Sequence, residues 1–390
     1  MPSVLNFLLQ KKTALFLWFG LSFFAVIKQA FSHHYNNYLI YKFTFFNVIH
    51  QHNLYLPQPE HFLDVNHYGP LFALFIAPFV WLPDPVAVVL WVMFNAYILF
   101  VAINHLPLVN QHKIIILLLC AHELMTASFS VQFNPCMAAI ILLSFILIRQ
   151  KKDFWAACLI ILGTFIKLYG IVGLAFFFFS DHKLKLILSL IFWSVAFFVL
   201  PMLLSSPAFI IQTYRDWLKV LIEKDAENAA SVMQDISVMG LIRRIFHLPK
   251  ISDGIVLLPA LAVFGSSYLF IKKYNELPYQ LLILSSTLLF TVLFSSGSES
   301  PTYIIAFAGV AIWFVNLPKP VTPLQIALLV FAFILTSLSP SDIFPKSIKN
   351  EYIVKYSLKA LPCLLVWLTV IYETWTRNMK DQTEKTELAV

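Results

Sequence analysis

Charged residues are scarce in this 390-residue chain. Only 12% of the residues are charged and 59% are hydrophobic, whereas an ordinary soluble domain is roughly 25% charged. This balance excludes a soluble globular protein. A spanning helix takes about 20 apolar residues, so twelve spans would use roughly 240, close to the apolar share of the chain. The composition therefore predicts an all-α polytopic membrane protein.

Other features are also missing. The four cysteines lie inside apolar runs without CxxC spacing, so neither disulfides nor a zinc site is indicated. No Lys/Arg tract with interleaved aromatics occurs, so the net charge of +7 indicates the positive-inside bias and not a nucleic-acid partner. With ten glycines and no internal repeat, inverted-repeat transporter folds are disfavoured. No cofactor is indicated.

Long apolar runs are what the chain does have. We expect a single integral membrane domain over residues 1–376 and a polar cytoplasmic tail over 377–390. The basic residues near both ends place the N- and C-termini in the cytoplasm, which predicts a multi-pass protein of the cytoplasmic (inner) membrane. The candidate spans are 13–32, 69–83, 85–104, 113–130, 134–148, 154–179, 185–204, 254–271, 279–296, 301–317, 322–338 and 358–375.

The topology of the front half is ambiguous. Twelve crossings place the basic cluster 149–152 outside, against the charge rule. The run 154–179 carries Lys167 at its middle and is long enough for two short helices meeting near that lysine at the outer face. We favour this split, which requires one other front segment not to cross.

Three hydrophilic loops, 33–68, 205–253 and 339–357, are then predicted outside, which makes the outer face the working face. In the first loop, Asn37–His50 predicts an amphipathic helix at the membrane surface. Its apolar face would comprise Tyr38, Tyr41, Phe45 and Ile49.

The first loop also holds six of the eleven histidines. They are either metal ligands or, as we prefer, interfacial polar residues, because His50 and His52 point to different helix faces. Asp64, Asn66 and His67 directly precede the next span, at the predicted water boundary.

Ionisable residues inside spans indicate function by default. Lys167 requires an anionic partner, either the phosphate of a lipid carrier or Glu123, whose simpler role is an ion pair within the bundle. Gln132 and Asn134 fall at the start of a predicted helix and either cap it or bind ligand.

Two further sets of polar residues lie in outer segments. Glu299 sits among small residues in an outer turn, as a ligand contact or as a solvated charge. Arg215, Lys219, Arg243 and Arg244 would either grip a phosphate or sugar or form salt bridges with Asp216 and Glu223.

Three stretches carry a likeness to a known family. They are NNYLIYKFTFFNVIHQHNLY with NHYGPLFALFIAPFVWLP, then VQFNPCMAAIILLSFILIRQKKDFWAACLIILGTFIKLYGIVGL, then SGSESPTYIIAFAGVAIW. Together they resemble the DUF2029 or GT87 group of membrane glycosyltransferases, of the GT-C superfamily. The likeness implies a GT-C-like bundle of about twelve helices whose outer first loop carries an interfacial helix.

The resemblance also implies a reaction. Such enzymes move a sugar from a polyprenyl-phosphate donor to a glycan or glycolipid acceptor at the outer face of the membrane. A general base on the first loop takes the acceptor proton and cationic groups hold the departing phosphate, so that a single displacement inverts the anomeric centre.

This chain departs from the family pattern at several positions. The family's first-loop Asp, taken as the base, aligns with Asn37, and an amide cannot act as a base at neutral pH. Val131 replaces a Gly before Gln132, and Gly170 replaces a Pro after Lys167. The family also has a His in its late outer motif, which no His of this chain matches; Pro301 or Thr302 stands near that position.

We therefore expect Asp64, with Glu60 as second candidate, to be the base. Lys167, or more weakly Arg215, would hold the phosphate. Asn37, His67, Gln132 and Glu299 would line the donor or acceptor pocket. The alternatives are a transporter or lipid flippase without group transfer, and an inactive protein that kept the fold.

Overall fold

A computed structural model describes residues 6–7, 9–231, 233–341 and 344–379, and within these ranges the regular structure is helical, with no strand. The predicted all-α class is thereby confirmed. The chain divides into two compact units. The first comprises Met1–Pro107 and Leu124–Ala226, and the second comprises Leu108–Glu123 and Glu227–Val390. Most of the tail predicted over 377–390 lies outside the described residues.

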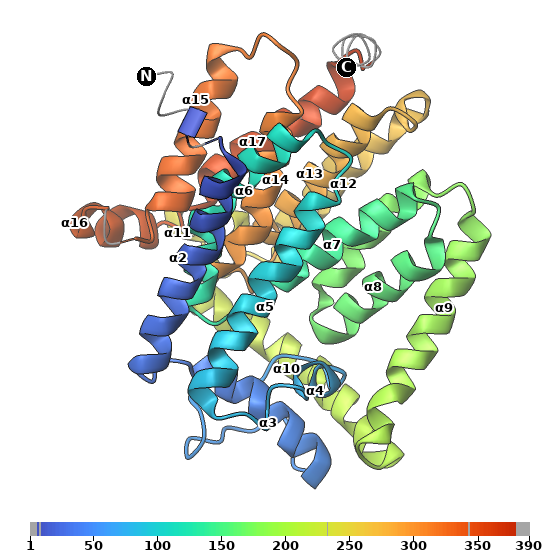
Figure 1. The fold of residues 1–390 in the computed structure, drawn as a ribbon, viewed down its shortest axis with the longest axis vertical. Coiled ribbons are helices and arrows are strands. Elements are labelled where there is room, and N and C mark those ends of the chain that lie inside the picture. The colour runs from blue at the N-terminus through green and yellow to red at the C-terminus, as the bar shows by residue number, and fades with distance from the viewer. Residues whose placement is uncertain (1–5, 8, 232, 342–343, 380–390) are drawn as a thin grey trace. The chain divides into compact units, whose positions relative to one another are not determined.

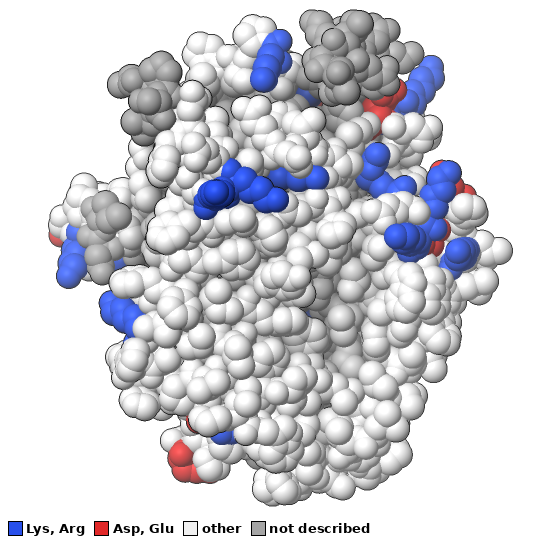
Figure 2. All heavy atoms as spheres, in the orientation of Figure 1, with Lys and Arg blue, Asp and Glu red and all other residues white. Residues whose placement is uncertain are grey.

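Helices dominate the chain (Figure 1). Among the described residues, four are long and apolar enough to cross a membrane: Lys11–Phe31, Asp84–Asn104, Asn110–Phe129 and Lys183–Leu203. Eight more are apolar but shorter, so the expected count of twelve spans is not confirmed. On the face drawn in Figure 2, uncharged atoms predominate and Lys and Arg form small separate groups.

The first unit contains α2 and the whole of the predicted first loop, 33–68. Its elements are α2 (Lys11–Phe31), α3 (Asn36–His50), α4 (Phe72–Ile76), α5 (Asp84–Asn104), α7 (Asn134–Arg149), α8 (Asp153–Ile166), η1 (Leu168–Phe179), α9 (Lys183–Val199) and η2 (Leu200–Leu203). The boundaries between the two units fall within α6 (Asn110–Phe129) and α10 (Pro207–Ala230), so each of these helices belongs partly to both units.

Small side chains allow α2 and α5 to pack closely. Ala14 and Ala25 of α2 and Ala96 of α5 are fully buried, as is typical where membrane helices approach one another. The indole Nε1 of Trp18 donates a 3.0 Å hydrogen bond to the carbonyl of Ala96. This bond satisfies a polar group that would otherwise be costly in an apolar setting.

The predicted amphipathic helix of the first loop is α3. Tyr38, Tyr41 and Phe45 are buried as expected, whereas Ile49 is 36% exposed and falls outside that face. Helix α3 packs on α4. Its sequence pattern therefore identified the inner face of the helix except at its last turn.

The candidate span 69–83 was wrong, because α4 has only five residues. At about 1.5 Å per residue it is far too short to cross a bilayer. The physical reason is Pro78, which follows Ile76 by two residues and lacks the N–H that a continuing helix requires. This is consistent with the expectation that one front segment fails to cross.

The run 154–179 is split in two, as predicted. Helix α8 ends at Ile166, Lys167 has an extended backbone, and η1 begins at Leu168. A Cβ atom on Gly170 would lie 2.3 Å from the carbonyl carbon of Gly163 and 2.2 Å from the backbone nitrogen of Thr164. Only glycine permits so close a return of η1 along α8, and this contact closes the hairpin with Lys167 at its tip.

The second unit is built on α13 (Leu277–Leu293), α14 (Tyr303–Val315) and α17 (Ala360–Thr376), which contact one another and lie near one another in Figure 1. Gly309 of α14 approaches the carbonyl of Ser285 closely, and the Ser285 hydroxyl donates to the Gly309 carbonyl at 2.7 Å. The remaining elements are α11 (Val238–Ile245), α12 (Asp253–Ser266), η3 (Ser267–Leu269), η4 (Ile271–Lys273), η5 (Ser300–Thr302), α15 (Pro323–Phe331), η6 (Ala332–Leu338), α16 (Lys346–Ile348) and η7 (Lys349–Val354).

Candidate active site

Lys167 occupies the tip of the α8–η1 hairpin in the first unit. Its ammonium donates a 2.9 Å hydrogen bond to Oδ1 of Asn134 at the start of α7. The Nζ atom also lies 4.8 Å from the ring centroid of Tyr169 and 5.8 Å from that of Tyr68. Both distances are within the range of cation–π attraction. The lysine is thus held between two helices and two aromatic rings.

The end of the first loop is hydrogen-bonded to the tip of this hairpin. The N–H of Gly69 donates to the carbonyl of Ile166 at 3.0 Å. A Cβ on Gly69 would lie 2.1 Å from the carbonyl oxygen of Phe165, so the approach requires glycine. Buried Asn66 accepts the N–H of Tyr68 at 3.0 Å, which fixes the residue whose ring faces Lys167.

The turn between α6 and α7 lies beside the lysine. Asn134 donates to Oε1 of Gln132 at 3.3 Å while accepting from Lys167. The capping alternative for these two residues is not what the structure shows, because α7 has Phe133 at its N-cap and no side-chain cap bond. Gln132 and Asn134 instead extend the polar set around Lys167.

Val131, just before this pair, has φ of 50°. A β-branched residue in the left-handed region is a strained conformation. The sequence pattern of the resembled family has Gly here, and the backbone geometry gives the reason. The valine side chain is fully buried, so the surrounding packing holds it in place.

Asn37, at the position of the family's first-loop Asp, contacts the same turn. Its Nδ2 donates to the carbonyl of Ser130 at 2.7 Å. Only the amide can make this bond, since an ionised carboxylate has no proton to donate. Asn37 therefore ties the start of α3 to the α6–α7 turn.

Asp64 and His67 complete the arrangement. Asp64 has φ of 72°, and its Oδ1 accepts the N–H of Val65 at 2.8 Å and lies 3.5 Å from Nζ of Lys224. The backbone carbonyl of His67 accepts from the indole of Trp217 on α10 at 2.9 Å. These contacts join the end of the first loop to α10.

Burial is the main cause that lowers the pKa of His67 to about 4. The positive charges of Lys224 and Lys167 lower this pKa further, and the nearby Asp64 carboxylate opposes them. The imidazole is consequently neutral at pH 7. Its Nε2 is buried and has no hydrogen-bond partner within the described part of the chain.

Five of the seven expected site residues thus belong to one neighbourhood of the first unit: Asn37, Asp64, His67, Gln132 and Lys167. Arg215 is exposed on α10, the helix whose Trp217 contacts His67. Glu299 belongs to the second unit, where the Gln234 amide lies 3.5 Å from its Oε1.

Glu123 is not the partner of Lys167. It is fully buried in the second unit, and both of its carboxylate oxygens accept from Lys359, at 3.1 and 3.2 Å. The same ammonium donates to the carbonyl and the hydroxyl of Ser300, each at 3.0 Å. The ion pair expected for Glu123 exists, but with a residue that the sequence did not suggest.

The basic residues of the second hydrophilic loop, 205–253, have different interaction partners. Arg243 is buried and pairs with Asp235, at 2.7 Å, and with Asp253. Arg244 donates to the hydroxyl of Ser357 and to the carbonyls of Ser231 and Gln234. Lys219 does form an expected surface pair, with its Nζ 3.8 Å from Oε1 of Glu223. The expected partners of both arginines were therefore wrong.

The sequence did not single out three residues that contact the candidate site: Tyr68, Tyr169 and Lys224. Tyr169 follows Lys167 by two residues, and Tyr68 adjoins His67, so an aromatic residue near each candidate was an available signal. Lys224 is 160 residues from Asp64 in the chain, and nothing local distinguishes it from other helix-surface lysines.

The model of glycosyltransferase family 87 matches residues 66–296, more than half of the chain. The chain belongs to glycosyltransferase family 87. No curated protein sequence matches it. Membership supports a transferase with a sugar donor and an acceptor as substrates. With the apolar helices, it supports a membrane protein with transmembrane helices.

The region matched to family 87 contains His67, Gln132, Lys167 and Arg215. Asn37 and Asp64 precede it, and Glu299 follows it. The family assignment and the arrangement around Lys167 therefore coincide over the α6–α7 turn and the α8–η1 hairpin.

Proposed function

We propose that this family 87 protein transfers a hexose-type sugar from a polyprenyl-phosphate donor to a glycan or glycolipid acceptor. The reaction would occur at the outer face of the cytoplasmic membrane. The observation that carries the proposal is the placement of Lys167 at the tip of a hairpin of apolar helices, beside the polar end of the first loop. A donor with a polyprenyl tail reaches such a tip through the bilayer.

Lys167 is proposed to hold the phosphate that leaves. Negative charge grows on this phosphate as the bond from the anomeric carbon to the phosphate oxygen breaks, and an ammonium placed there favours the transition state. The hydrogen bond to Asn134 and the two tyrosine rings restrict the lysine to one position. Gln132, next to Asn134, would contact the donor.

Asp64 is proposed to take the proton of the acceptor hydroxyl as the oxygen attacks the anomeric carbon, with inversion. Its exposure to solvent suits a residue that receives an acceptor, since its side chain is 51% exposed. His67 is neutral and lies within electrostatic range of both Asp64 and Lys167. It is suited to a hydrogen bond with a sugar hydroxyl between them.

Two matched pairs of variants test these roles. Asp64→Asn is compared with Glu60→Gln, which alters the other candidate carboxylate of the same loop. Lys167→Gln is compared with Lys219→Gln, which removes an exposed charge on α10. With purified protein and a polyprenyl-phosphate hexose, Asp64→Asn should slow phosphate-carrier release about 10²–10⁴-fold, and both control variants should retain activity. Full activity of Asp64→Asn would remove Asp64 from the role of base.

An inactive family member is the second candidate, and Asn37 favours it. The amide donates to Ser130 and cannot take a proton. This alternative predicts that no polyprenyl phosphate is released with any sugar donor, even though the donor binds. A transporter or flippase likewise releases no polyprenyl phosphate, but moves an intact lipid-linked sugar between the leaflets of a vesicle.

A further inference from the structure

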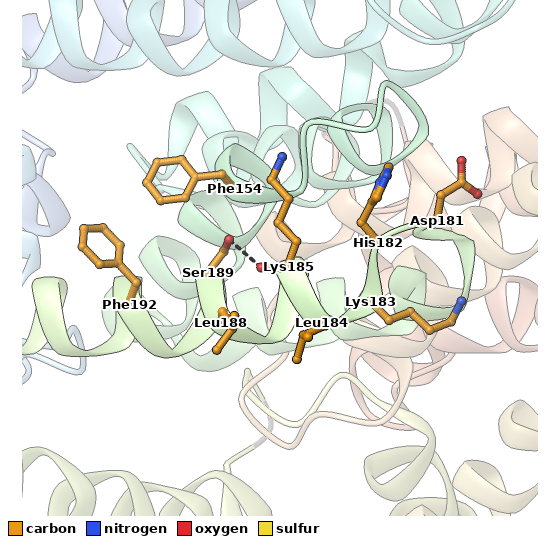
Figure 3. Close-up of a pocket in the computed structure, with 9 residues that line it drawn as sticks. All are labelled: Phe154, Asp181, His182, Lys183, Leu184, Lys185, Leu188, Ser189 and Phe192. Atoms are coloured by element: carbon orange, nitrogen blue, oxygen red, sulfur yellow. Dashed lines mark hydrogen bonds between the residues drawn. The ribbon is translucent and has the colours of Figure 1, made fainter.

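A groove of about 810 Å³ opens in the first unit at the opposite end of α8 from Lys167. It is lined by Phe154 near the start of α8, by the first half of α9 and by the short segment between η1 and α9 (Figure 3). Helix α8 has 14 residues, so its two ends lie about 21 Å apart. The groove is therefore separate from the proposed donor site.

One side of the groove is apolar. Leu184, Leu188 and Phe192 follow one another along α9 and are 69%, 58% and 54% exposed. Phe154 of α8 also lines the groove. In a helix that is long and apolar enough to cross a membrane, exposed side chains of this kind favour contact with acyl chains.

The other side is basic. In Figure 3 the side chain of Lys185 rises from α9 between Phe154 and His182. Within the described residues no hydrogen bond or ion pair involves the Lys185 ammonium. Lys183 donates to the carbonyl of Ser180 at 3.0 Å. The groove thus has one ammonium that is available to an anion, at the first turn of a helix, where the helix dipole also favours negative charge.

The carboxylates nearby are already engaged. Asp181 pairs with Lys151 at 2.9 Å. Asp153 is fully buried, accepts from the hydroxyl of Ser180 at 2.7 Å and lies 3.7 Å from Nδ1 of His182. Because these carboxylates are paired, the Lys185 ammonium gives the opening of the groove its positive charge.

We propose that this groove binds an anionic phospholipid, with the headgroup phosphate at Lys185 and an acyl chain along Leu188 and Phe192. Charge complementarity selects an anionic headgroup, and the exposed apolar residues of α9 select a lipid over a free anion. Basic pockets between membrane helices are established sites for anionic headgroups.

The test measures lipid binding to the full chain, purified in neutral detergent, by native mass spectrometry. Phosphatidylglycerol is compared with phosphatidylcholine, and glycerol phosphate serves as the competitor without acyl chains. Lys185→Gln is the test variant. Lys12→Gln is the matched control, because Lys12 is an exposed lysine in the first turn of another long apolar helix, α2. Phe192→Ala probes the apolar side.

The expected result is that the wild-type chain and Lys12→Gln retain phosphatidylglycerol equally, while Lys185→Gln binds it about fivefold more weakly, the effect of one lysine near a lipid headgroup. Phe192→Ala should weaken binding without changing the preference for the anionic lipid. Equal binding of phosphatidylcholine, full competition by glycerol phosphate, or an equal loss in Lys12→Gln would each overturn the proposal. No sugar transfer is measured, so the outcome does not depend on the proposed function.

Discussion

Nζ of Lys167 lies 2.9 Å from Oδ1 of Asn134, which links the tip of the α8–η1 hairpin to the start of α7. The asparagine is 1% exposed, so this acceptor lies in a fixed, protected position. An amide oxygen orients an ammonium without neutralising its charge. The pairing therefore suits a lysine that has to meet a second, anionic group.

Gly170→Ala should disrupt the hairpin. The added methyl group would fall within 2.3 Å of the backbone of Gly163 and Thr164, and overpacking of this kind costs about 1–3 kcal/mol or more. Both stability and activity should fall, because Lys167 is displaced. The matched control is Gly265→Ala in α12, where nothing lies within 4 Å of the new methyl group. Thermal unfolding in detergent measures the difference, and equal melting temperatures for the two variants would contradict the close packing.

Val131→Gly should be more stable than Val131→Ala, by about 1 kcal/mol, because φ of 50° strains any residue with a Cβ atom. The order should reverse at Val92, a buried residue within α5, where Gly is the worse helix former. Thermal unfolding of the four variants gives both comparisons. The same order at both positions would show that the strain at Val131 is absent.

The pKa of His67 predicts a dependence of stability on pH. Because the folded-state pKa of about 4 lies below the ordinary value of 6.5, the unfolded chain binds the proton more readily between these values. Stability should be full above pH 6.5 and fall by about 3 kcal/mol as the pH drops to 4. His67→Gln should lose less stability over this range than the wild type. His52→Gln, at an exposed position of the same loop, should behave like the wild type.

The buried pair of Glu123 and Lys359 should behave as a unit. Glu123→Gln alone leaves a buried ammonium without its counter-charge and should destabilise the second unit by about 3–5 kcal/mol. Adding Lys359→Met should restore part of that loss, since no isolated charge remains. Thermal unfolding of both single variants and the double variant measures the coupling. If the loss of stability in the double variant equalled the sum of the losses in the two single variants, the two charges would not interact.

The sequence was sufficient to predict the helical class, the inner face of α3 and the break at Lys167. These features follow from local apolarity, helical spacing and a charge in the middle of a long run. The span expected over 69–83 failed because Pro78 ends the helix although the apolarity continues. Hydropathy alone does not register the missing N–H.

Partners distant in the chain were beyond sequence reasoning. Glu123 and Lys359 are 236 residues apart, and Lys224 approaches Asp64 from another helix. Charge type indicates that a buried ion needs a partner, but many residues of opposite charge satisfy that requirement equally. Gln132 and Lys167 were proposed as site residues because their polar side chains stand beside or within long apolar runs, and Asn37 because it aligns with the first-loop Asp of the resembled family.

The most direct test of the account is the release of polyprenyl phosphate from a polyprenyl-phosphate hexose by wild-type protein and by Lys167→Gln. We expect release by the wild type, with the rate in Lys167→Gln lowered about 10²–10³-fold and the melting temperature of that variant close to that of Lys219→Gln. Release by Lys167→Gln at the wild-type rate would contradict the assignment of Lys167 as the group that holds the departing phosphate.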